Sequence, residues 1–199
     1  MPSAITDLLH LLPDKDILVW FGHSSYFIQA DGKWILVDPV FNDSASPLPY
    51  SVKSFGGSDE YTTEDIPKID YLYISHDHWD HLDYATIKKI QPQVKKIIIG
   101  LGTAEHLIYR GNDISTIIEK DWNEKIILDE GFEVNTLPAR HFSGRAFKRQ
   151  QSLWMSVALK TPTHNIFIGG DSWYEAYFLK IGNTFGPFDL AILKIWSVT

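Results

Sequence analysis

The sequence contains no cysteine among its 199 residues. This absence excludes disulfide bonds, thiolate metal ligands and a cysteine nucleophile, so a metal ion would have to be held by histidine and carboxylate side chains. Positive charge is also scarce, because 18 Lys and Arg residues stand against 25 Asp and Glu residues and give a formal net charge of −7. An acidic balance of this kind argues against a general nucleic-acid-binding protein, and we expect no nucleic-acid partner.

Long uncharged apolar segments are missing as well. No window of the sequence approaches the roughly 18 apolar residues that a membrane-spanning helix needs. Residues 1–13 also lack the positively charged region of a signal peptide. We therefore expect a cytoplasmic protein without a membrane span, its oligomeric state left open. Its leucine-rich start is expected to pack on the protein's own core, with peripheral contact with a lipid surface as the alternative.

The composition is otherwise that of a globular protein, with 44% hydrophobic and 22% charged residues. The length predicts a single domain over residues 1–199. Strands are expected at 17–21, 26–30, 34–37, 71–74, 97–99, 114–118, 125–128, 133–137, 153–159, 166–168 and 190–195. Helices are expected at 83–90, 103–109 and 172–181, and a long loop at 38–67 is expected to wall a pocket. Because strands alternate with helices in both halves, we expect an α/β (α+β) protein of stacked layers.

One short segment concentrates metal-binding side chains. His76, His78, Asp80 and His81 form the pattern His-x-His-x-Asp-His between an expected strand and an expected helix. In extended backbone, side chains two residues apart share one side, and the turn into the helix can bring the last two residues to the same place. Composition alone would produce this pattern in about one such chain in a thousand. The segment therefore predicts a site for zinc or a similar divalent ion.

Two further candidate ligands follow expected strands later in the chain. His141 comes after the apolar run 134–139, and Asp171 comes directly after the pair Gly169 and Gly170. Glycines let the backbone pass close to its surroundings, so Asp171 is well placed to bridge two ions.

These motifs together resemble the metallo-β-lactamase-fold hydrolases. The surrounding sequence resembles one branch in particular, which contains N-acyl-phosphatidylethanolamine phospholipase D and the L-ascorbate-6-phosphate lactonase-like proteins. The segments that carry this resemblance are Gly22-His23-Ser24-Ser25, Val37-Asp38-Pro39, Ala139-Arg140-His141 and Gly169-Gly170-Asp171-Ser172. The resemblance implies a four-layer αββα sandwich.

The resemblance also implies a ligand set. One ion would lie on His76, His78 and His141, and a second on Asp80 and His81, with Asp171 bridging the two. Asp80 would in addition act in catalysis by holding or relaying a proton of the nucleophile. The family normally supplies a further histidine to the second ion from a segment that follows the strand matching 190–195. Because the sequence ends at Thr199, we expect a C-terminally incomplete sandwich and one or two Zn²⁺ ions, or another divalent metal.

Four more residues are candidates for supporting roles. His23 would contact a metal ligand or the substrate, or be an ordinary buried histidine. Asp38 would orient a metal ligand, or cap a turn before proline. Arg140 and Arg145 would bind an anionic group, since segment 134–170 contains no Asp or Glu but five basic residues. A cationic rim favours phosphodiesters, phosphorylated sugars or carboxylates, whereas a solvated basic loop is the alternative.

The leading functional hypothesis is a zinc-dependent hydrolase. In it, metal-activated water attacks a phosphodiester, a lactone or an ester in a small anionic or lipid-like substrate. One alternative is a truncated, non-catalytic homologue with a partial metal site, because the apolar run 190–193 calls for cover on both faces. Another is a di-iron redox protein on the same fold. His78 argues against it, since proteins of that kind typically place a carboxylate at this position.

Overall fold

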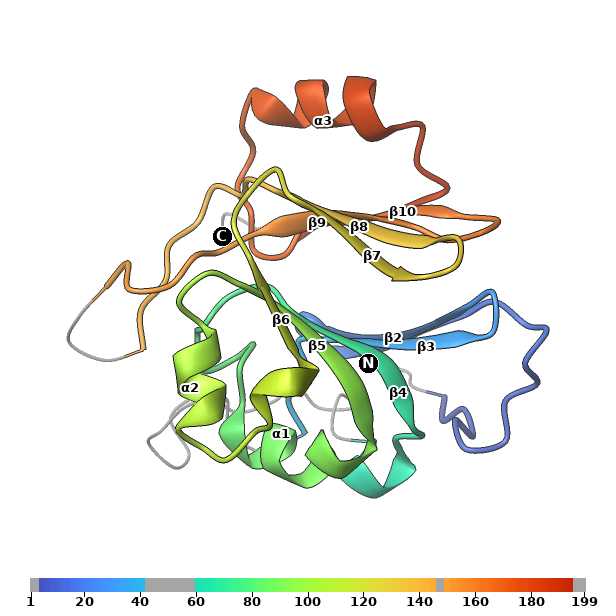
Figure 1. The fold of residues 1–199 in the computed structure, drawn as a ribbon. Coiled ribbons are helices and arrows are strands. Elements are labelled where there is room, and N and C mark those ends of the chain that lie inside the picture. Colours follow the sequence, from blue (N-terminus) through green and yellow to red (C-terminus); the bar gives the residue numbers. More distant parts are fainter. Residues whose placement is uncertain (1–3, 42–59, 146–148, 195–199) are drawn as a thin grey trace.

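Two β-sheets lie face to face with helices on both outer faces, in the part of the chain that the computed structural model describes: residues 4–41, 60–145 and 149–194 (Figure 1). The first sheet has the order β1 (Ile17–Gly22), β2 (Ser25–Ala30), β3 (Lys33–Val37), β4 (Ile69–Ile74), β5 (Val94–Gly100) and β6 (Ile117–Lys120). Strands β1 to β3 form an antiparallel meander, and β3 to β6 run parallel.

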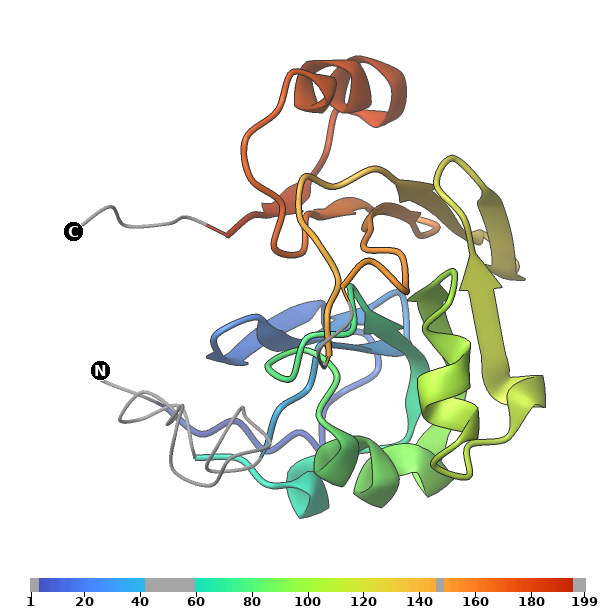
Figure 2. The ribbon, with the colours of Figure 1, turned by 90° about the vertical axis from the view of Figure 1, so that its left-hand side faces the viewer.

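The second sheet has the order β11 (Leu190–Ile192), β10 (Asn165–Ile168), β9 (Ser156–Lys160), β8 (Phe132–Leu137) and β7 (Lys125–Asp129). Its strands are antiparallel except for the parallel pair β10 and β11. Helices α1 (Tyr84–Ile90) and α2 (Ala104–Ile108) cover the first sheet, and α3 (Tyr177–Phe185) covers the second, so that the two sheets separate α3 from the other two helices (Figure 2). This is the expected αββα order of layers.

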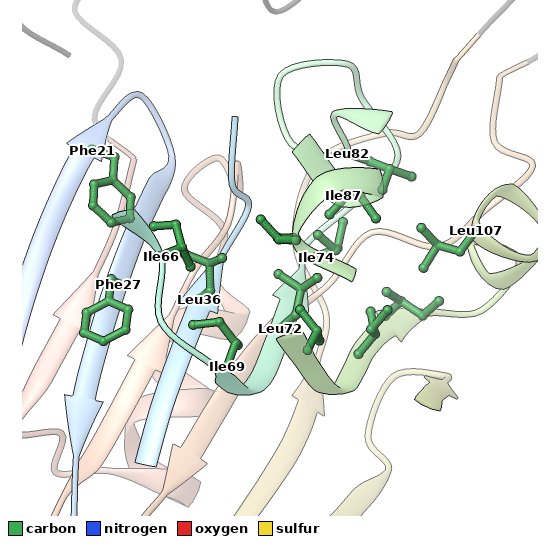
Figure 3. Close-up of a cluster of buried hydrophobic side chains, with 14 of the residues drawn as sticks. Phe21, Phe27, Leu36, Ile66, Ile69, Leu72, Ile74, Leu82, Ile87 and Leu107 are labelled. Carbon is green, nitrogen blue, oxygen red and sulfur yellow. The ribbon is translucent and has the colours of Figure 1, made fainter. Parts of the chain in front are cut away.

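Three apolar clusters hold the layers together. The first lies between the first sheet and helices α1 and α2, where Leu72 and Ile74 meet Ile87 and Leu107 (Figure 3). The second lies between the two sheets, and the third joins α3 to the second sheet. Strand β4 is buried on both faces from Tyr71 onward, and this explains why residues 71–74 form a continuous apolar run rather than an alternating pattern.

Helix α3 differs from its expected position. We expected a helix over 172–181 that stops at Gly182, but α3 begins at Tyr177 and runs through Gly182 to Phe185. Its start is delayed because the preceding residues are held elsewhere, with the Ser172 hydroxyl accepting from the Arg140 amide at 2.8 Å. Its end is extended because Phe185 continues the apolar face that packs on the second sheet.

Three other expected elements also begin or end elsewhere. The expected strand 114–118 starts as the 3-10 helix Ile114–Thr116, because the Asp113 carboxylate accepts from the Ser115 amide at 2.9 Å. The expected strand 153–159 pairs within the second sheet only from Ser156 onward. The last strand ends at Ile192 rather than at 195.

Of the expected loop 38–67, residues 42–59 lie outside the described part, and the 3-10 helix Thr63–Asp65 interrupts the rest. The remaining 3-10 helix is Gln91–Gln93, which follows α1 directly. Within the described ranges, no helix is long and apolar enough to cross a membrane.

Candidate metal centre

The segment between β4 and α1 is fixed at both of its ends. At the strand end, the Ser75 amide and hydroxyl donate to the Asp38 carboxylate at 2.7 and 2.6 Å, and Ser75 O accepts from the amide of Met155, the residue before β9. At the helix end, the Asp83 carboxylate accepts from the Thr86 amide and hydroxyl, which caps the N-terminus of α1. The segment 76–82 is thereby held in one conformation at the edge of the first sheet.

The other candidate ligands come from loops at the same end of the sheets. His23 lies in the turn between β1 and β2, His141 follows β8, and Asp171 follows β10. Gly170 before Asp171 has a positive φ of 57°, and a Cβ there would come within 3.0 Å of Ser75 Cβ. The glycine therefore lets the backbone pass close to its surroundings, as expected from the sequence, and the neighbour here is Ser75 at the end of β4.

Three imidazole rings converge on one point. His141 Nε2 lies 3.1 Å from His76 Nε2 and 3.3 Å from His78 Nδ1. Zinc–nitrogen bonds of 2.0–2.1 Å in a tetrahedron separate two ligand nitrogens by about 3.3 Å, so these spacings match the edges of a zinc site. Burial lowers the pKa of His76 well below its ordinary value and that of His141 to about 4, which keeps both rings neutral at neutral pH. The three residues therefore fit a divalent ion.

A second group of candidate ligands adjoins the first. His81 Nε2 lies 3.3 Å from Asp171 Oδ2 and 3.9 Å from Asp80 Oδ2, and His23 Nε2 lies 2.8 Å from the same Asp80 oxygen. Asp171 Oδ2 is also 4.0 Å from His141 Nε2, so its carboxylate stands between the two groups. His23, for which the sequence left three roles open, belongs to this second group and not to the ring cluster.

The second group is electrostatically different from the first. Burial lowers the pKa of His81, but the carboxylates of Asp38 and Asp171 outweigh it and raise that pKa to about 10. Asp38 Oδ2 lies 2.8 Å from His81 Nδ1 and fixes the orientation of the ring, which is the orienting role considered from the sequence. In the metal-free protein, His81 is therefore a cation between two anions.

Arg145 lies beneath the ligand segment. Its side chain is 8% exposed, and its guanidinium carbon is 3.9 Å from the centre of the Trp79 ring and 3.8 Å from that of Tyr84. Its Nη1 donates to the carbonyl oxygen of Asp77 at 2.8 Å, and Asp77 Oδ1 accepts from the Gly144 amide at 2.8 Å. These contacts tie the segment of His76 and His78 to the segment of His141.

The expected cationic rim is reduced among the described residues. Arg145 is turned inward, and Lys160 ends β9 at the end of the sheet away from His141. Arg140 is exposed and forms an ion pair of 3.2 Å with Glu175, and Lys148 lies outside the described residues. The sequence could not show this, because the aromatic partners of Arg145 come from a distant segment.

A cavity of about 450 Å³ opens beside the second group. It is lined by Trp20, His23, Ser24, Tyr26, Asp38, Gly170, Ile192, Leu193 and Lys194. The Lys194 ammonium contacts Asp171 Oδ2, and Ser24 Oγ donates to Asp171 Oδ1 at 3.2 Å. Sequence reasoning missed Lys194, Ser24 and Ser75. The one available signal for Lys194 was its position two residues after a strand parallel to the strand that leads to Asp171.

Comparisons with known proteins identify the family of the chain. Residues 33–199 match the family model described as the beta-lactamase superfamily domain. An uncharacterised protein of Mycobacterium tuberculosis is 39% identical over 177 residues, which make up 88% of this chain and 47% of that protein. N-acyl-phosphatidylethanolamine-hydrolyzing phospholipase D 1 of Caenorhabditis elegans is 31% identical over 192 residues, covering 88% of this chain and 52% of that protein. The chain thus spans about half the length of these curated relatives.

Solved structures share the fold. The diiron β-hydroxylase CmlA of Streptomyces venezuelae matches with a TM-score of 0.68 and 24% identity, over 90% of this chain and 34% of that one. A metallo hydrolase of Ignicoccus hospitalis matches with a TM-score of 0.64 and 21% identity, over 84% of this chain and 66% of that one. With the family model matching residues 33–199 and the histidine motif lying between a strand and a helix as expected, the chain belongs to the metallo-β-lactamase superfamily.

Proposed function

We propose that this chain is a zinc-dependent hydrolase whose substrate is an anionic phosphodiester, ester or lactone. The observation that carries the proposal is the convergence of His76, His78 and His141, whose ring nitrogens lie 3.1 and 3.3 Å apart around one point. An all-nitrogen set of three ligands is typical of catalytic zinc sites that keep a fourth position open. Its chemistry is that of a Lewis acid, which lowers the pKa of a water molecule and polarises a substrate oxygen.

Asp80 is the residue that we propose to hold the proton of the attacking water. Its carboxylate lies 3.9 Å from His81 Nε2, in the group that adjoins the ring cluster, and His23 Nε2 fixes one carboxylate oxygen at 2.8 Å. Burial raises the pKa of Asp80, but His23 and His81 outweigh it and keep that pKa well below its ordinary value, so the carboxylate is ionised and can accept a hydrogen bond. Replacing His23 with alanine should then leave the Asp80 carboxylate mobile and slow hydrolysis.

The substrate class follows from the cavity beside the site and from one relative. The Caenorhabditis elegans relative is named for hydrolysis of an N-acyl phospholipid. In this chain, the cavity combines the polar groups of His23 and Lys194 with the apolar side chains of Trp20 and Leu193. A substrate with an anionic group and an apolar portion matches this lining. We therefore propose that the substrate is a lipid-like phosphodiester rather than a polar sugar phosphate.

The experiment compares His76→Ala with His164→Ala, a matched control in the turn between β9 and β10. Each protein is loaded with zinc, desalted and assayed for bound metal and for hydrolysis of bis(p-nitrophenyl) phosphate and a p-nitrophenyl ester. We expect His76→Ala to retain background zinc and lose hydrolysis, and the control to match wild type. Unchanged zinc in His76→Ala would contradict the site, and zinc without hydrolysis of either compound would contradict the activity.

Metal analysis of the protein as purified, before zinc is added, decides between the proposal and its di-iron alternative. Iron as the retained metal would favour the di-iron redox hypothesis, for which the structural likeness to CmlA supplies only the fold. A folded protein that binds a metal ion and hydrolyses neither compound would favour the non-catalytic homologue.

A further inference from the structure

We propose that the Lys194 ammonium occupies the position beside Asp171 that a second metal ion would need, and thus takes the place of that ion. The chain would then bind a single divalent ion on His76, His78 and His141. This inference rests on the proposed metal-dependent function and concerns how many ions the site takes.

The position of Lys194 is set by the strand that precedes it. Strand β11 runs parallel to β10, and the Gly169 amide donates to the carbonyl oxygen of Ile192 at 2.9 Å. A Cβ at Gly169 would lie 2.9 Å from Leu193 Cδ2 and 3.1 Å from Ile192 O, so the two chain segments touch closely here. Because these parallel strands end at the same edge of the sheet, Asp171 and Lys194, which follow them, lie next to each other there.

Asp171 has both of its oxygens engaged by protein donors. Ser24 Oγ donates to Oδ1 at 3.2 Å, and the Lys194 ammonium donates to Oδ2. The same Oδ2 faces His81 Nε2 at 3.3 Å, and it is the oxygen that would have to bridge two ions. The Asp171 side chain is 4% exposed and that of Lys194 is 21% exposed, so this ion pair is screened from solvent and strengthened by its surroundings.

Of the other candidate ligands of a second ion, Asp80 is engaged and His81 is not. Asp80 Oδ2 is held by His23 at 2.8 Å, whereas Asp38 holds His81 Nδ1 at 2.8 Å and leaves His81 Nε2 without a hydrogen-bond partner among the described residues. A second ion would therefore have to displace the Lys194 ammonium and then lie beside it, a contact between like charges. In contrast, the nitrogens of the three-histidine cluster face one another rather than a competing ammonium group.

The charge of the site favours one ion over two. Three carboxylates surround the two groups, on Asp38, Asp80 and Asp171. One divalent ion, the Lys194 ammonium and the His81 cation together carry four positive charges, one more than the carboxylates balance. Two divalent ions beside Lys194, with His81 as a neutral ligand, would leave an excess of two positive charges in a largely buried site, which costs free energy unless further anions enter.

The test measures zinc stoichiometry in the full chain, with zinc chloride as the only added metal. Wild type, Lys194→Met and Lys194→Gln are stripped with chelator, reloaded and desalted, and zinc per chain is determined by elemental analysis. Titration against a chromophoric chelator gives the number and affinity of the sites independently. Lys180→Met, which removes an exposed lysine from α3, serves as the matched control.

We expect one zinc per chain in wild type and in Lys180→Met, and a rise toward two in the folded Lys194 variants. Two zinc ions in wild type would overturn the proposal whether or not the variants fold. Retention of one zinc by both folded Lys194 variants would overturn it too. Zero zinc in wild type would instead remove the proposed metal-dependent function on which this inference rests, so the two failures are distinguishable.

Discussion

Replacing Arg145 with methionine tests the idea that this residue positions the metal ligands rather than binding substrate. Methionine keeps most of the unbranched stem and removes the guanidinium. The group that is lost lies between the rings of Trp79 and Tyr84, at 3.9 and 3.8 Å from their centres, and donates to Asp77 O at 2.8 Å. The variant therefore removes three contacts with little change in volume.

The magnitude follows from those contacts. Each cation–π contact stabilises a desolvated site by about 1–2 kcal/mol, and a hydrogen bond from a charged donor by about 1.5–3 kcal/mol. Against this stands the cost of burying the guanidinium of Arg145, whose Nε and Nη2 have no hydrogen-bond partner among the described residues. Burial lowers its pKa to about 10, which reflects that cost. We expect a net loss of about 2 kcal/mol in the free energy of unfolding.

The loss should extend to metal affinity. Asp77 lies between His76 and His78 in sequence, and its side chain also holds Gly144, three residues beyond His141. Without the guanidinium, the two ligand-bearing segments are held together less firmly, and loss of such outer contacts typically weakens metal binding about 10- to 100-fold. We expect the lower end of this range, because the Asp77–Gly144 bond remains.

Urea unfolding of the metal-free and the zinc-loaded protein measures the first effect, and competition with a chromophoric chelator measures the second. Arg110→Met is the control, since the exposed Arg110 guanidinium also stacks on Tyr84, at 4.3 Å, but makes no contact with the ligand segment in the described structure. If Arg145→Met lost no more stability than this control and bound zinc as tightly as wild type, the positioning role would be refuted.

Three further predictions concern pH, backbone strain and metal removal. The hydrogen bond from Lys33, followed by that from Tyr71, lowers the pKa of Asp129. Wild type should therefore unfold at higher urea than Asp129→Asn at pH 7. The difference should begin to shrink near pH 4, the ordinary pKa of an aspartate, and vanish only once the pH falls below the lowered pKa of the native carboxylate. Gly170→Ala should lower the free energy of unfolding by about 2 kcal/mol, because of its positive φ and the crowding of its Cβ. Gly182→Ala, in open space within α3, should raise that free energy by about 0.5–1 kcal/mol in the same urea assay. Chelation should lower the melting temperature by about 5–10 °C in a thermal-shift assay if zinc was present at about 100 times its dissociation constant, and an unchanged value would exclude a stabilising ion.

Local signals in the sequence predict much of the first sheet. The pair Asp31 and Gly32 predicts a two-residue hairpin, and the structure confirms it between β2 and β3, with φ of 48° and 72° at the two residues. His76 and His78 follow a buried strand as expected, because apolar runs on parallel strands fix where each strand ends. These features depend on a few neighbouring residues and are therefore readable without the tertiary structure.

Other features depend on partners that are distant in sequence. The start of α3 is delayed by contacts between Ser172 and Arg140, which no local pattern contains. The inward turn of Arg145 depends on Trp79 and Tyr84, which are more than 60 residues away. From the sequence, Lys194 is an ordinary residue of the expected strand 190–195, and only the pairing of β11 with β10 brings it to Asp171. In each case, long-range packing decides the conformation.

The ligands of the proposed ion come from both sheets, and this has a consequence for how a newly made chain matures. His76 and His141 are separated by 65 residues, and they meet only when the two sheets have packed on each other. A nascent chain therefore cannot capture its ion as each ligand emerges, and loading becomes a late step of assembly. Once bound, the ion would link the two sheets through its ligands, and we expect it to be released when the sheets separate.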